Sequence, residues 1–219
     1  MLGAEPLNGA LVDMVLPLEC GGCRTPGTRW CDRCARALHV AADEPHVVTP
    51  RVDPGVPVFG LGRYAGVRRC AVVALKEHGR RDLVAPLARA LALGIHHLIG
   101  WGIVSAPLVV VPAPTRRLSA RRRGGDPVTR IAMAATANGP GLRVVPALRT
   151  AALVRDSVGL GTAARERNIA GRVRLTARPA GEVLVVDDVV TTGATAREAV
   201  RTLRDGGVAV SAVLALAWA

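Results

Sequence analysis

Aromatic residues and lysine are scarce in this chain. Phe, Trp and Tyr make up 2% of its 219 residues, so aliphatic side chains must fill the core and few rings can stack on nucleic-acid bases. Lys76 is the sole lysine, although Lys and Arg together number 29 against 17 Asp and Glu. The net charge of +12 is therefore carried by arginine, and it favours partners that bear phosphate, whether nucleotides, nucleic acid or an anionic membrane.

Long apolar runs and several common motifs are also missing. No segment has the roughly 20 uninterrupted apolar residues of a membrane helix. The segment before Cys20 contains Asp13 and no basic leader, unlike a secretory signal. We therefore expect a cytoplasmic protein in a reducing compartment, with no membrane contact. The stretches GLGRYA at 60–65 and GLGTAA at 159–164 lack the strand and helix context of a dinucleotide site, and no Walker-type loop occurs.

The cysteines are few but ordered. Four of the five form the pattern C-x2-C-x7-C-x2-C, made of Cys20, Cys23, Cys31 and Cys34. Each C-x2-C pair can turn two thiolates towards one ion, eased in the first pair by two glycines, so the pattern predicts a closed, structural Zn²⁺ site. Two disulfides or a redox-active C-x2-C are the alternatives, and a reducing compartment disfavours the first. Cys70 stands apart and is expected to pack as a small buried hydrophobe.

Apolar spacing predicts an α/β fold with an open parallel sheet and flanking helices, preceded by a small zinc module. Three parts are predicted: an N-terminal helix and zinc knuckle over 1–42, a linker rich in proline and acid over 43–58, and the main domain over 59–219. Helical patterns lie at 68–79, 83–99, 127–137 and 194–207, and strand patterns at 106–114, 182–186 and 208–219. The strand at 182–186, the helix at 194–207 and the strand at 208–219 form a βαβ crossover, whose helix ends at Gly206 and Gly207.

One block, VLVVDDVVTTGATA at 183–196, carries the strongest chemical signal. Its apolar strand is predicted to end at Asp187 and Asp188, and open parallel sheets bind ligands beyond the carboxyl ends of their strands. The following loop offers backbone amides and hydroxyls, a glycine for close approach and the N-terminus of the next helix, so it is expected to bind phosphate. Its residues are Thr191, Thr192, Gly193, Ala194 and Thr195.

The two carboxylates would be repelled by that phosphate. We expect them to face vicinal sugar hydroxyls or a bound Mg²⁺ instead, and a sugar 5-phosphate satisfies both halves of the block. The alternative is a threonine helix cap with two solvated acids at a strand end.

Cations at a second strand end are expected to complete the site. The stretch VVVPAPTRR at 109–117 would hold a pyrophosphate through the backbone near Ala113 and through Thr115, Arg116 and Arg117. Lys76 is a further candidate for that group. For each cation, a solvated turn or helix end is an equal alternative. Segment 155–168 is predicted to form a hood loop over the pocket, closing at its two glycines.

The block D-D-x-x-T-T-G-x-T resembles the signature of type I phosphoribosyltransferases. This resemblance implies binding of phosphoribosyl pyrophosphate (PRPP), with Thr191–Thr195 on the 5-phosphate and the two acids on the ribose hydroxyls. The rest of the chain resembles the ComF/GntX group (competence protein F) of that superfamily. The shared motifs are the cysteine knuckle, Y-x-G-x-x-R at Tyr64–Arg69, LKEHG at Leu75–Gly79, VPAPTRRLSARRRG at Val111–Gly124, and R-E-R-N at Arg165–Asn168.

Two departures from the group affect the acceptor side of the pocket: RRGGDP at Arg122–Pro127 replaces R-G-F-N-Q, and DSVGLG at 156–161 replaces a glutamine-bearing stretch. One hypothesis is an enzyme that binds Mg²⁺ and PRPP, and lets a base or amine nitrogen displace pyrophosphate, in DNA uptake or nucleotide salvage. The other is a non-catalytic accessory protein that binds single-stranded DNA beside competence and recombination proteins and keeps the pocket as a nucleotide sensor. A nucleotide-regulated transcription factor ranks last, because no helix-turn-helix pattern is evident.

Overall fold

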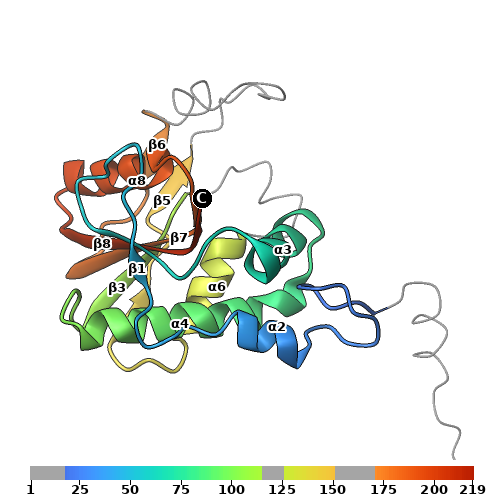
Figure 1. Ribbon diagram of the computed structural model, residues 1–219. Coiled ribbons are helices and arrows are strands. Elements are labelled where there is room, and N and C mark those ends of the chain that lie inside the picture. Colours follow the sequence, from blue (N-terminus) through green and yellow to red (C-terminus); the bar gives the residue numbers. More distant parts are fainter. Residues whose placement is uncertain (1–17, 115–125, 151–170) are drawn as a thin grey trace, which may run out of the picture.

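The computed structural model describes residues 18–114, 126–150 and 171–219. Within these ranges the chain forms a mixed α/β fold, with a mostly parallel sheet of six strands and helices on both of its faces (Figure 1). Three predicted features lie outside the described residues: the helix at the N-terminus, the pyrophosphate residues Thr115, Arg116 and Arg117, and the hood loop at 155–168.

The six strands of the main sheet have the order β1-β2-β8-β7-β3-β4. β1 is antiparallel to β2, and every other neighbouring pair is parallel, as the sequence predicts for the main domain. In that order the strands are His46–Val47, Val58–Gly60, Val210–Trp218, Glu182–Val190, Leu108–Pro112 and Leu142–Val144. A separate antiparallel pair consists of β5 (Leu148–Thr150) and β6 (Val173–Leu175). β7 is therefore an interior strand with parallel partners on both sides.

The helices confirm the predicted helical patterns. They are α2 (Asp32–Ala37), α3 (Gly66–Glu77), the 3-10 helix η1 (Arg81–Leu83), α4 (Val84–Gly100), α6 (Pro127–Thr136) and α8 (Ala194–Asp205). Figure 1 shows α4 and α6 on one side of the sheet and α8 on the other. Alternate side chains of β7 point to opposite faces of the sheet. Leu184 and Val186 pack with α4 and α6, whereas Val183 and Val185 pack with α8.

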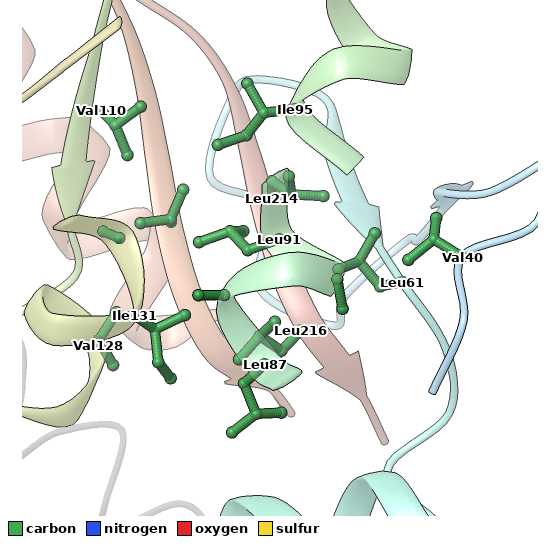
Figure 2. Close-up of a cluster of buried hydrophobic side chains, with 14 of the residues drawn as sticks. Val40, Leu61, Leu87, Leu91, Ile95, Val110, Val128, Ile131, Leu214 and Leu216 are labelled. Carbon is green, nitrogen blue, oxygen red and sulfur yellow. The ribbon is translucent and has the colours of Figure 1, made fainter. Parts of the chain in front are cut away.

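Helix α4 contributes the largest share of one core. Leu87, Leu91 and Ile95 (Figure 2), together with Leu98, recur at helical spacing and are buried against the sheet. Burying each such side chain contributes about 1.5–3 kcal/mol. Helix α6 begins where Asp126 accepts a hydrogen bond from the amide of Val128, with proline in its first turn.

The continuous helix Arg81–Gly100 is long and apolar enough to cross a membrane by length and composition alone. Arg81, Asp82 and Arg89 lie within this helix, so the sequence still has no uninterrupted apolar run of that length. The helix is this apolar because its apolar stripe is wide, and the core side chains of α4 described above occupy that stripe. Core helices of folded proteins can have the same length and apolar composition.

Candidate functional site

The four predicted zinc ligands lie together. Their Sγ atoms are all within 4.8 Å of one another, and the Sγ of Cys31 is 3.7 Å from that of Cys20 and 3.6 Å from that of Cys23. Four sulfurs bound about 2.3 Å from one tetrahedral zinc ion are about 3.8 Å apart. All five cysteines are free thiols. The cluster therefore has the size and the donor set of a structural zinc site, and could hold that ion.

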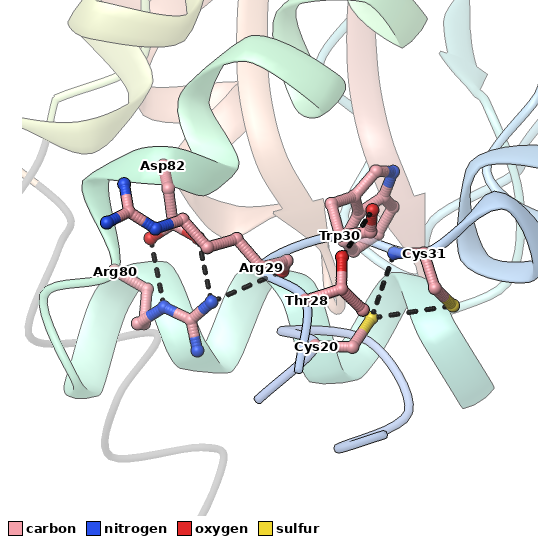
Figure 3. A network of polar contacts seen from close by, with 7 residues as sticks. All are labelled: Cys20, Thr28, Arg29, Trp30, Cys31, Arg80 and Asp82. Atoms are coloured by element: carbon pink, nitrogen blue, oxygen red, sulfur yellow. Dashed lines mark hydrogen bonds and ion pairs between the residues drawn. The ribbon is translucent and has the colours of Figure 1, made fainter. Parts of the chain in front are cut away.

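The loop around the cluster is shaped by close packing. Its backbone closes through hydrogen bonds from Cys20 N to Thr25 O at 2.8 Å and from Gly21 N to Arg29 O at 3.0 Å, and the amide of Cys31 donates to the Sγ of Cys20 (Figure 3). A Cβ on Gly22 would lie 2.6 Å from the Sγ of Cys34. The glycine is therefore needed for space beside the thiols, in addition to any easing of the turn.

The thiols differ in acidity. Hydrogen bonds from Thr25 and then Arg33 lower the pKa of Cys23 to about 5, whereas burial raises the pKa of Cys34. A thiolate is the form that binds metal, so Cys23 is ready for an ion at neutral pH. Cys70 is half-buried and lines a cavity beside Cys20, which corrects the expectation that it is simply a buried hydrophobe.

The strand that carries the paired acids is longer than predicted. β7 continues to Val190 instead of ending before Asp187, because the apolar partner strand β8 extends the ladder as far as the pair Val190 and Trp218. Asp187 is in register with Ala215, whose side chain packs on the α8 side. Asp188 is buried and meets a lysine from α3 on the opposite side. The two carboxylates thus leave the strand towards different faces of the sheet.

Lys76 forms an ion pair with one of these acids. Its Nζ lies 2.6 Å from Oδ2 of Asp188. Burial is the largest single influence and lowers the pKa of Lys76, but the charge and the hydrogen bond of Asp188, with smaller contributions, together outweigh it, so the net shift is upward. Burial, and then the charge of Asp188, raise the pKa of Asp187 to about 8. At neutral pH Asp187 therefore keeps its proton beside the ion pair of Lys76 and Asp188. The expected role of Lys76 on a pyrophosphate stays a prediction.

The threonine loop follows β7 directly and leads into α8. Gly193 has a φ of 88° and precedes Ala194, whose amide donates to Oγ1 of Thr192 at 3.4 Å. The amide of Val52 donates to the carbonyl of Thr192 at 2.8 Å. A Cβ on Gly193 would overlap the carbonyl oxygen of Val52. The glycine thus admits another segment of the same chain, where the sequence analysis expected it to admit a ligand.

That segment belongs to the predicted linker, 43–58, which contains β1 and reaches the first residue of β2. No spacing or motif marks Val52 as a neighbour of the loop, so sequence reasoning missed it. Ala113, predicted near the pyrophosphate, is buried and donates its amide to Val186 O at 2.8 Å. The other predicted pyrophosphate residues, Thr115, Arg116 and Arg117, lie outside the described residues.

The structure therefore pairs Lys76 with Asp188, directs Asp187 to the other face of β7, and places Thr191–Thr195 at the same strand end. In comparisons with known proteins, no family model matches the chain and no curated protein matches it. The fold and site define its class: an α/β protein with a mostly parallel sheet, a four-cysteine cluster that could hold zinc, and an acid pair followed by a threonine turn at the end of an interior strand. The resemblance to type I phosphoribosyltransferases rests on the sequence motifs alone.

Proposed function

We propose that this chain is a PRPP-binding protein of the type I phosphoribosyltransferase superfamily, in the ComF/GntX group, which transfers or recognises a phosphoribosyl group in the cytoplasm. One observation carries the proposal. The acid pair and the threonine turn stand together at the carboxyl end of β7, an interior strand of a parallel sheet, with the N-terminus of α8 directly behind the turn. Ligands of such sheets bind at that edge, and helix N-termini favour phosphate.

In this proposal each group has one task. The amides of Thr191–Thr195 hold the 5-phosphate, and the acids accept hydrogen bonds from the ribose hydroxyls. A base or amine nitrogen then forms a bond to the anomeric carbon as the bond from that carbon to the pyrophosphate oxygen breaks, and pyrophosphate leaves with the electron pair. Positioning and cations around the leaving group lower the barrier. Lys76, at the end of α3, is the described cation nearest to the acids.

The two metals of the proposal have different places. Zn²⁺ would be held by the four cysteine thiolates and would serve the fold. Mg²⁺ prefers hard oxygen ligands, which the pyrophosphate of the ligand offers in number. An ammonium group 2.6 Å from Asp188 competes with a divalent cation bound directly to that carboxylate. The donor set of the protein thus favours Mg²⁺ that arrives with PRPP.

The test is a calorimetric titration of the protein with PRPP and Mg²⁺. The double variant Asp187→Asn/Asp188→Asn should weaken binding at least about tenfold, equivalent to about 1.4 kcal/mol. Asp205→Asn is the matched control, because it removes an exposed carboxylate at the far end of α8, and it should bind as the wild type does. Pyrophosphate release on addition of nucleobases would establish transfer. Wild-type protein that binds no PRPP contradicts the proposal.

A DNA-binding accessory role is the second candidate, favoured by the net charge of +12. Binding would be to backbone phosphates, so the logarithm of the affinity for single-stranded DNA should fall linearly with the logarithm of salt concentration. Fluorescence anisotropy with a labelled oligonucleotide at several salt concentrations measures this. PRPP binding without turnover, together with salt-sensitive DNA binding, would favour this role over the enzyme.

A further inference from the structure

A cavity of about 330 Å³ lies between the zinc loop and helix α3, away from the acid pair. We infer that it binds a small phosphate monoester, at a site separate from the proposed PRPP site. The inference does not rest on the proposed function. It rests on the shape, the charge and the fixed donors of the cavity.

The two walls of the cavity differ in character. Cys70, Val73 and Ala74 recur at helical spacing, so they form one face of α3. The opposite wall is the loop of the zinc module from Glu19 to Arg24. Small-molecule sites span about 300–1,000 Å³, and this cavity is at the lower limit. It therefore suits a ligand with a small organic part that can lie on the apolar side chains of α3.

Three arginines, Arg24, Arg69 and Arg80, line the cavity. Arg24 and Arg69 are exposed, and their side chains form no hydrogen bond or ion pair with any described residue. The guanidinium of Arg80 is fixed: its Nε and Nη2 donate to the carboxylate of Asp82 at 2.9 and 2.7 Å, and Nη2 also donates to the carbonyl of Arg29 (Figure 3). This arrangement leaves the Nη1 donors of Arg80 without a partner among the described groups.

A phosphate monoester carries a charge of about −1.5 to −2 near neutral pH, which two free guanidinium groups match. Guanidinium forks also fit the geometry of phosphate oxygens. Glu19 is the acidic residue of the lining and opposes such a ligand.

The site also gives the zinc module a task beyond its own folding. Because one wall is the metal-binding loop, the cavity depends on the four thiols being held together. Removal of zinc should therefore abolish binding at this site even if the sheet remains folded.

The experiment is a calorimetric titration of the full, zinc-loaded chain with adenosine 5′-monophosphate and, separately, with inorganic phosphate, without Mg²⁺. Arg69→Ala should weaken binding of the nucleotide about tenfold, the loss of one charge-assisted contact. Arg24→Gly should do the same, and glycine suits the φ of 61° at that position. Glu19→Gln should tighten binding about threefold, because it removes the opposing charge.

Arg36→Ala is the matched control, since Arg36 is an exposed arginine of α2 outside the lining, and it should change the affinity less than about twofold. Dependence of nucleotide binding on Arg24 and Arg69, which line this cavity, separates this site from the proposed PRPP site. The inference is overturned if the wild type shows no saturable binding of either probe at millimolar concentration, or if Arg36→Ala weakens binding as much as Arg69→Ala. Binding of a single-stranded oligonucleotide in place of both small probes overturns it as well.

Discussion

The zinc module and the end of β7 are built in opposite ways. The four thiols come from a short stretch, Cys20–Cys34, and hydrogen bonds within that stretch close the loop. The end of β7 is assembled from distant segments: Lys76 arrives from α3 and Val52 from the segment before β2. A zinc ion held by these thiols would therefore support the module, whereas the strand end depends on the packing of the whole sheet.

The two regions should therefore gain their folding free energy from different sources, metal binding in one and aliphatic burial in the other. A module with few buried side chains gains most of its folding energy from metal binding. At the strand end, each contact contributes only a few kcal/mol, because the sheet and its two cores are already folded by aliphatic burial. Loss of the ion should consequently act on one region alone, whereas loss of a contact at β7 should act on global stability.

The largest effect is expected from Cys34→Ser. Loss of one thiolate should remove zinc binding, worth on the order of 10 kcal/mol, and unfold the module while the sheet persists. Hydrogen exchange would show rapid amides in residues 18–42 and continued protection in β7 and β8. Zinc content is measured by a colorimetric chelator. Cys70→Ser is the matched control, because Cys70 is a half-buried thiol outside the cluster. Equal zinc loss in both variants would contradict the assignment of the ligands.

An intermediate effect is expected at the two ends of α8. Gly193 and Gly207 both have positive φ, but a Cβ on Gly193 would overlap the Val52 carbonyl, whereas one on Gly207 would meet open space. Gly207→Ala should cost about 1 kcal/mol for the left-handed backbone alone. Gly193→Ala should cost about 3 kcal/mol because the overlap is added. Urea unfolding measures both, and equal losses would show that the segment at Val52 does not press on the loop.

The parts that the sequence predicted correctly depend on local pattern. Helical spacing placed α4 and α6, and the C-x2-C pairs placed the thiols, because each pattern needs only neighbouring residues. The end of β7 was misplaced because acids are disfavoured in strands. The apolar run of β8 overrides that local preference by offering ladder partners up to Trp218.

The contacts around the acids could not be read from the sequence at all. Lys76 and Asp188 are far apart in the chain, and their 2.6 Å ion pair exists because α3 covers the face of the sheet to which Asp188 points. The same holds for Val52 and Thr192. A sequence shows that a lysine is rare, but it does not show which carboxylate the lysine will meet.

The smallest effect is expected in the pH dependence of the strand end. The pKa of Asp187 is raised to about 8 by burial first and then by the charge of Asp188, against about 3.9 in an unfolded chain. Between these values the folded state keeps a proton that the unfolded chain has lost, so this stabilisation is complete below about pH 4 and disappears as pH rises through about 8. Asp187→Asn should therefore gain at least about 1 kcal/mol in unfolding free energy, relative to wild type, between about pH 6 and pH 9. The exposed control Asp205→Asn should have a pH profile of stability parallel to that of wild type. A parallel profile for Asp187→Asn would contradict the prediction, because it would show that Asp187 is as open to water as an acid of the surface.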